Sequence, residues 1–142
     1  MTTKTRVLFV CTANAARSQM AEGLLRAKYG DRYEVFSAGT RQAKVSISAI
    51  AVMQEIGIDI SHHRSKTLDE FRGATFDIAV TLCDNAHAIC PIISGAKKTI
   101  HHGFSDPHLI PGSDETILDG YRRARDEIAT WIAGEFGKLM QK

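Results

Sequence analysis

The stretch from Val7 to Leu25, VLFVCTANAARSQMAEGLL, decides the fold of this 142-residue chain. An apolar run over Arg6–Val10 predicts a buried strand that ends just before Cys11. Apolar residues then recur at helical spacing over Ser18–Tyr29, with a glycine directly after them. Five small or polar residues, Thr12–Ala16, join the two elements. The stretch therefore predicts a strand, a tight loop and a helix in that order.

The same alternation continues along the chain. Strands alternating with helices predict an α/β fold, a single-domain open, doubly wound four-stranded parallel sheet flanked by helices. The chain contains no repeat, low-complexity tract or linker, so we expect one domain over residues 1–142. The further strands are predicted at Tyr33–Phe36, Phe76–Leu82 and Lys98–His102, and the further helices at Ile47–Ile56 and Glu115–Leu139.

Composition narrows the function classes. The formal net charge is +2, and no run of five or more basic residues occurs, so we expect no nucleic-acid partner. No segment approaches about 18 consecutive apolar residues, and the N-terminus lacks the apolar core of a signal peptide. We therefore expect a cytoplasmic protein with no membrane partner, and a monomer. Three cysteines form a poor disulfide framework, so each is considered for its chemistry.

The loop after the first strand has the features of an oxyanion site. Open α/β sheets bind ligands at the carboxyl ends of their strands, where Cys11 lies. Successive N–H groups of a small-residue loop and of a helix N-terminus can surround an anion, and Arg17 can add a planar pair of donors. This positive field favours the thiolate form of Cys11, to which Ser18 could donate a hydrogen bond. The predicted oxyanion-binding residues are Thr12, Ala13, Asn14, Ala15, Ala16, Arg17 and Ser18.

The alternative interpretation makes Cys11 a small buried hydrophobe and Arg17 a solvated helix residue. A Cys and an Arg six positions apart are common by chance, but their place between a strand and a helix favours the catalytic interpretation. Cys83 and Cys90 follow a second strand at the same sheet edge, so they are candidates for redox chemistry rather than inert thiols. Asp106, before a proline, is either a turn residue or a general acid.

The histidines are poor candidates for metal ligands. His62–His63 and His101–His102 are adjacent pairs, and no Cys/His spacing fits a zinc site. We interpret them as structural or surface residues, and we expect no bound metal or cofactor.

The motifs in combination carry a resemblance that covers nearly the whole chain. VCTANAARSQMAE resembles the loop of thioredoxin-coupled arsenate reductases, which share the low-molecular-weight protein tyrosine phosphatase fold. The continuation RSQMAE favours the reductases over the phosphatases, and the DPHL segment has His108 where phosphatases carry a tyrosine. The matching segments are SAGT at 37–40, EIGIDISHHRSKTLDE at 55–70, VTLCDNAHAICP at 80–91 and GFSDP at 103–107.

This resemblance implies a function in arsenic detoxification. Cys11 would attack arsenate, Cys83 would attack Cys11 to release arsenite, and Cys90 would attack Cys83, so that the final disulfide is reduced by thioredoxin. Asp106 would be the general acid. The open alternatives are a phosphatase that hydrolyses a Cys11 phosphocysteine, a non-catalytic oxyanion-binding module, and glutaredoxin with glutathione in place of thioredoxin.

The chain departs from the family pattern at three positions. Related loops usually carry Gly and Ser where this chain has Ala13 and Ala15, so a left-handed backbone at Ala13 would be costly and a hydroxyl is missing at Ala15. Some related reductases hold potassium near the loop, with residues like Asn14, Glu22 and Ser37 plus an acidic residue. Here Lys66 takes the acidic position, and its ammonium group should repel a cation.

Overall fold

The computed structural model describes residues 4–82, 93, 95–104 and 112–137. Within these ranges the chain alternates strands and helices as the sequence predicts. The elements are β1 (Thr5–Cys11), α1 (Arg17–Tyr29), β2 (Tyr33–Gly39), α2 (Ile47–Gln54), a 3₁₀ turn η1 (Leu68–Phe71), β3 (Phe76–Thr81), β4 (Ala96–His101) and α3 (Asp114–Gly137).

The four strands form one parallel sheet in the order β2-β1-β3-β4. The chain leaves β1 toward β2 on one side and later returns to β3 on the other side. The loop after β1 therefore lies at the topological switch point of the sheet, where open α/β sheets bind ligands. The predicted fold class is confirmed.

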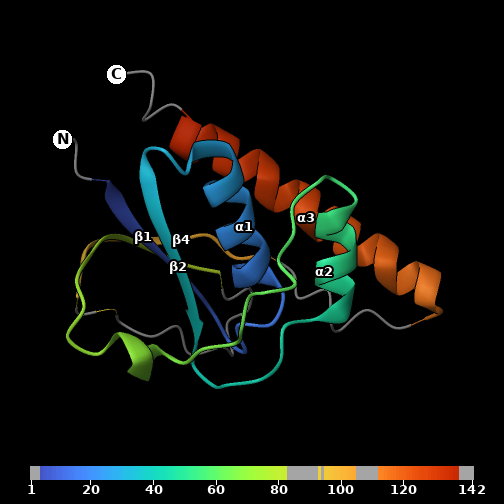
Figure 1. Ribbon diagram of the computed structural model, residues 1–142, viewed down its shortest axis with the longest axis horizontal. Helices are drawn as coiled ribbons and strands as arrows, with labels where there is room; N and C mark the ends of the chain where they lie inside the picture. Colours follow the sequence, from blue (N-terminus) through green and yellow to red (C-terminus); the bar gives the residue numbers. More distant parts are fainter. Residues whose placement is uncertain (1–3, 83–92, 94, 105–111, 138–142) are drawn as a thin grey trace.

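Alternate residues of β1 face two separate cores. Val7 and Phe9 pack with residues of all three α-helices, and Figure 1 shows these helices together on one side of the sheet. Leu8 and Val10 point the other way. The described residues that cover them include Leu68 and Phe71 from η1, and Ile93, which precedes β4. Because both faces of β1 are covered, its sequence is apolar without alternation.

The apolar stripe predicted along the last helix is the surface that α3 buries. Its buried members pack on α1 and on the sheet, and Phe136 contacts the rings of Phe9 and Tyr33 edge-to-face. The buried apolar residues of this stripe are Tyr121, Ala124, Ile128, Ile132 and Phe136.

Several element ends differ by one to three residues from the sequence-based expectation, among them that of β4, which begins at Ala96 rather than Lys98. β2 continues past Phe36 to Gly39, because Gly39 pairs with Cys11 and its N–H donates to the Lys66 carbonyl. α2 stops at Gln54 rather than Ile56, because a turn closed by Gly57 at φ +80° replaces the last helical residues. Among the helices that the structure describes, none is long and apolar enough to cross a bilayer.

Gly39 allows β2 to approach the loop after β1. A Cβ atom built on Gly39 would lie 2.7 Å from both the Asn14 nitrogen and the Thr12 oxygen, which are backbone atoms that cannot move aside independently. By contrast, a Cβ atom on Gly134 in α3 would meet no atom within 4 Å.

We predict that Gly39→Ala destabilises the protein by about 1–3 kcal/mol, because the methyl group pushes the loop away from β2. Gly134→Ala is the matched control, and it should stabilise α3 by about 0.5–1 kcal/mol. Urea denaturation of both variants measures the difference. Equal stabilities of the Gly39→Ala protein and the unsubstituted protein would contradict the close approach.

Candidate active site

The loop from Thr12 to Ala16 is held in place by hydrogen bonds that other segments donate to its carbonyl groups. Each of the four consecutive carbonyls of residues 12–15 accepts a hydrogen bond from another part of the chain, at distances from 2.8 to 3.2 Å. The donors are Thr40 and Arg41 to Thr12, Ser65 to Ala13, Gln19 to Asn14, and Ser46 to Ala15.

The N–H groups of the same five residues behave differently. Within the described part of the chain, none of them donates a hydrogen bond, and α1 begins after Ala16 without a side-chain cap. Backbone N–H groups without an acceptor, next to the positive end of a helix dipole, form a site for an anion. This loop can therefore hold a tetrahedral oxyanion by its backbone.

Asn14 takes the one conformation in the loop that an ordinary L-residue avoids. Its φ is +51°, and it is the only non-glycine residue with a positive φ among those described. Asparagine tolerates this region better than most residues. The strain that the sequence suggested for Ala13 is therefore absent, because the left-handed position is one residue later.

The buried side chain of Asn14 sets the direction of the hydrogen bonds around Cys11. Its Nδ2 group donates to Ser18 Oγ at 2.8 Å and to Ser37 Oγ at 2.9 Å. Ser18 Oγ lies 2.9 Å from Cys11 Sγ. Since Ser18 already accepts from Asn14, its own proton is available to the sulfur, which is the arrangement that stabilises a thiolate.

Gln19 completes this network, a role that was not expected from the sequence. Its side chain is fully buried, and Nε2 donates to both Asn14 oxygens and to the Arg64 carbonyl. Its Oε1 atom lies 2.9 Å from His63 Nδ1. The sequence does show a polar residue in the first turn of the helix after the loop, which could have indicated a role near the site. It could not indicate the partners of Gln19, because they lie up to 45 residues away.

Arg17 is anchored to the two neighbouring strands. It is 5% exposed, and its Nη1 atom donates to the carbonyls of Leu82 at 3.2 Å and Phe104 at 3.1 Å. These carbonyls belong to the chain just after β3 and just after β4. The guanidinium group is therefore held at the carboxyl edge of the sheet, beside the loop.

A cavity of about 680 Å³ opens above this loop. Its lining comes from the loop, from the segment between β2 and α2, and from the first turns of α3. Cys11 and Arg17 both reach it, with Arg41 and Lys44 adding positive charge at its margin. The other predicted site residues, Cys83, Cys90 and Asp106, lie outside the described residues, and their roles stay predictions.

The residues near Glu22 do not fit a bound cation. Ser37 Oγ donates to Glu22 Oε1 at 2.5 Å, and Asn14 Oδ1 already accepts from Gln19 and from the Lys66 N–H. The Lys66 ammonium lies 4.0 Å from Glu22 Oε1, and burial lowers the pKa of Lys66. In the described ranges, no three His, Cys, Asp or Glu residues cluster as metal ligands.

His63 is a buried member of the same network. Arg26 Nη1 approaches His63 Nε2 at 3.2 Å, and an arginine can only donate, so Nε2 accepts and Nδ1–H donates to Gln19. Desolvation is the main cause that lowers the pKa of His63, opposed by the nearby Glu22 carboxylate and assisted by Arg26. His63 is therefore neutral in the folded protein.

We predict that His63 lowers the free energy of unfolding of the protein as the pH falls. The unfolded chain binds a proton at His63 below about pH 6.5, whereas the folded protein resists it, so stability is present above that pH and is lost toward the lower folded pKa. His63→Gln should flatten the decline in unfolding free energy below about pH 6.5. His62→Gln, at an exposed neighbouring position, is the control. An unchanged slope in His63→Gln would show that this group does not contribute.

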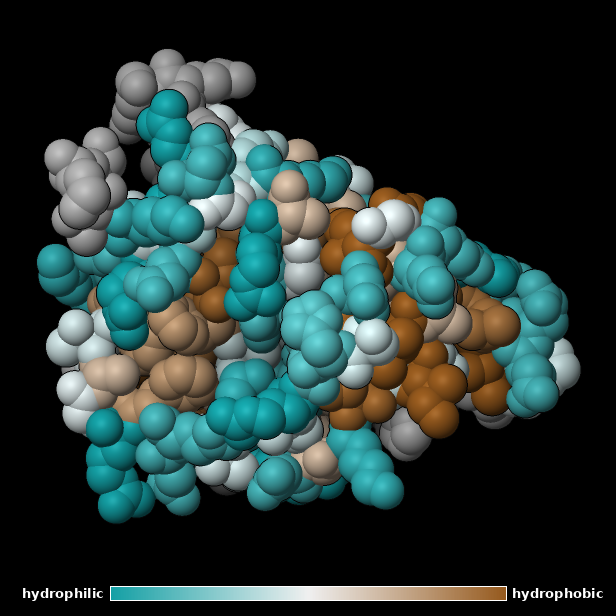
Figure 2. Space-filling view, in the orientation of Figure 1, coloured by the Kyte–Doolittle hydropathy of each residue, from teal (hydrophilic) through white to brown (hydrophobic). Residues whose placement is uncertain are grey.

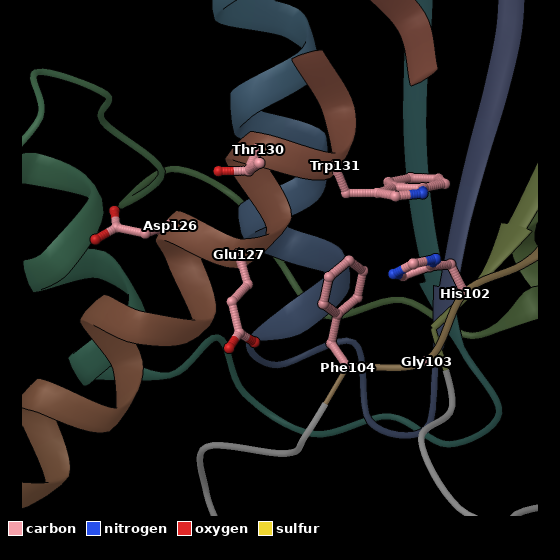
Figure 3. Close-up of a pocket in the computed structure, with 7 residues that line it drawn as sticks. All are labelled: His102, Gly103, Phe104, Asp126, Glu127, Thr130 and Trp131. Atoms are coloured by element: carbon pink, nitrogen blue, oxygen red, sulfur yellow. The ribbon is translucent and has the colours of Figure 1, made fainter. Parts of the chain in front are cut away.

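A second cavity, of about 570 Å³, lies between the end of β4 and α3. Figure 3 shows the ring of His102 facing that of Trp131, with Phe104 beside them, and the two stacked centroids are 5.0 Å apart. The two cavities share no described lining residue. Phe104 connects the two cavities. It lines the second cavity, and its carbonyl accepts a hydrogen bond from Arg17, which lines the first.

The fold and the loop place the chain in a known class. A family model described as low molecular weight phosphotyrosine protein phosphatase matches residues 6–140, and the chain belongs to this family. The curated relatives that it matches include arsenate reductases. The one from Halalkalibacterium halodurans is 43% identical over 126 residues, which cover 89% of this chain and 91% of that protein. The one from Bacillus subtilis is 39% identical over 122 residues, which cover 86% and 88%.

Solved structures agree with this assignment. A structure described as an arsenate reductase in the phosphate binding state has a TM-score of 0.80 and 29% identity, covering 94% of this chain and 98% of that chain. A low molecular weight protein tyrosine phosphatase from T. tengcongensis has a TM-score of 0.72 and 28% identity, covering 95% and 99%. The predicted resemblance and the prediction of an enzyme of the arsenate reductase group are confirmed.

Proposed function

We propose that this protein reduces arsenate to arsenite, with Cys11 as the nucleophile and the Thr12–Ser18 loop as the oxyanion site. The observation that carries this proposal is the difference between the carbonyl and the N–H groups of the loop backbone. The carbonyls are bonded outward, and the N–H groups donate to no described residue while they adjoin a buried thiol. The curated relatives that carry the name arsenate reductase supply the choice of anion.

The first step follows from this geometry. The loop N–H groups and the guanidinium of Arg17 would bind arsenate oxygens, which leaves arsenic facing the sulfur. Cys11 thiolate would attack arsenic, so that an As–S bond forms and an As–O bond breaks. The leaving oxygen departs as water after it accepts a proton, and we assign this general-acid role to Asp106.

The second and third steps move two electrons from thiols to arsenic. Cys83 would attack Cys11 Sγ, and the electron pair of the As–S bond would stay on arsenic, which leaves as arsenite. Cys90 would then attack Cys83, releasing the Cys11 thiolate and forming the Cys83–Cys90 disulfide. In support of this order of steps, Leu82, which precedes Cys83 in the sequence, donates its N–H to the Val10 carbonyl at 2.8 Å, beside Cys11.

Thioredoxin is the reductant that we propose for the last disulfide, in the cytoplasm, as part of arsenic detoxification. The proposal rests on the sequence resemblance and on a related structure described as a thioredoxin-dependent arsenate reductase, at 27% identity. Glutaredoxin with glutathione is the alternative reductant. Arsenite production with each purified reducing system, at equal reducing capacity, distinguishes the two.

Phosphatase activity is a second candidate function, favoured by the name of the family and by the related phosphatase structure. It would use the same first step on a phosphate monoester, followed by attack of water on the phosphocysteine. It needs neither Cys83 nor Cys90, so these two residues separate the functions.

We predict that Cys11→Ser abolishes arsenate reduction, because a neutral hydroxyl with no adjacent base is a poor nucleophile. Arg17→Lys should lower kcat/KM by at least about 100-fold, since an ammonium cannot make the bidentate contact. Arsenite release is the measurement, and circular dichroism checks that both variants fold. Near-normal turnover by either one would refute the assignment of the loop.

We predict that Cys83→Ser and Cys90→Ser each stop repeated turnover of arsenate with thioredoxin but leave hydrolysis of an aryl phosphate within about threefold of the unsubstituted rate. Cys90→Ser should accumulate a Cys11–Cys83 disulfide, which peptide mass spectrometry detects. If both variants continue to reduce arsenate with thioredoxin, the three-cysteine relay is wrong.

A further inference from the structure

Tyr121 carries a hydroxyl group that the fold leaves without a partner. It lies in α3 and is 2% exposed, and within the described part of the chain no hydrogen bond involves its hydroxyl. A hydroxyl with no partner in the protein, on a side chain that is almost completely buried, is available to hydrogen-bond a ligand.

The small exposed part of Tyr121 faces the cavity above the loop. Every fully buried side-chain nitrogen or oxygen in the described residues has a hydrogen-bond partner. The Tyr121 oxygen has none, so at least part of the small exposed area of this residue belongs to its oxygen. Tyr121 lines the same cavity as Cys11, Ala15 and Arg17.

Part of the cavity wall is apolar, although Arg41, Lys44 and Ser48 also line it. Val45, Ile47 and Ile117 line the same cavity, and Ile117 lies one helical turn before Tyr121. Figure 2 shows hydrophobic side chains over α2 and the adjoining part of α3, where Ile47 is 83% exposed. Of the cavity's serine hydroxyls, that of Ser46 accepts from the Ala49 N–H as the cap of α2. The Tyr121 hydroxyl is therefore a polar group next to an apolar part of the cavity wall.

We propose that Tyr121 is a substrate-binding residue that donates a hydrogen bond to the oxygen of the oxyanion that points out of the loop. A tetrahedral oxyanion presents three oxygens to the loop and Arg17, and its fourth oxygen then points away from the Cys11 sulfur into the cavity. A phenol O–H donates a hydrogen bond to this oxygen without adding a positive charge. The residue would thus favour ions with four acceptor oxygens over ions whose fourth substituent is a carbon. This inference rests on the proposed oxyanion site but not on the redox relay.

Binding without turnover tests the assignment. Calorimetry of the reduced protein compares inorganic phosphate with methylphosphonate, at a pH where both are dianions, for the unsubstituted protein and for Tyr121→Phe. Phosphate affinity should fall about tenfold in Tyr121→Phe, which is the size of one hydrogen bond to a charged group. Methylphosphonate has only three oxygens, all needed by the loop, so its affinity should change less than twofold.

Tyr33→Phe is the matched control, because Tyr33 is a buried tyrosine on β2 that does not line the cavity. It should leave both affinities unchanged. Thermal unfolding shows whether Tyr121→Phe folds, and Tyr121→Leu, which also lacks the hydroxyl, should repeat the selective loss if the phenylalanine variant does not fold. An equal loss of affinity for both ions, or no loss for either, would overturn the role of Tyr121. Failure of the unsubstituted protein to bind phosphate would instead refute the oxyanion site.

Discussion

The hydrogen bonds that the carbonyls of residues 12–15 accept from other segments are the constraint on which the site depends. A loop of small residues has no stable shape of its own, and without these bonds its peptide groups could turn either way. Donors from Thr40, Ser46 and Ser65 hold the carbonyls away from the centre. The N–H groups of the same residues donate to no described residue, which leaves them available to an anion. This explains how a loop with alanine at two positions keeps an anion-binding shape, since the shape is imposed from outside.

Asn14 connects this backbone arrangement to the thiol. Its left-handed conformation turns the loop, and its buried amide donates to Ser18, which is the neighbour of Cys11. The same amide reaches Gln19 and, through it, His63. On this side of Cys11 the network of Asn14, Ser18 and Gln19 is uncharged, and the ion pair of Glu22 and Arg26 lies beyond it.

The anchorage of Arg17 relates the anion site to the rest of the sheet. Its Nη1 atom bridges the chain just after β3 and just after β4. Both segments continue directly into the parts of the sequence that hold Cys83 and Asp106. An oxyanion that draws on this guanidinium therefore binds at the point where three strands end. This is the reason why the switch point of a parallel sheet suits a reaction that needs groups from distant parts of the chain.

Local sequence determined the order of strands and helices and the position of the loop, because apolar periodicity and a cysteine between a strand and a helix are properties of neighbouring residues. It also indicated Ser18 as a partner of Cys11, seven residues away. Other features depended on tertiary structure alone. The turn at Asn14 rather than Ala13, the carbonyl partners of Arg17 and the hydroxyl of Tyr121 in the cavity all involve groups that meet across the fold. The sequence could not specify them, because hydrogen bonds between residues 65 or 87 positions apart leave no local pattern and exist only once the sheet has brought its strand ends together.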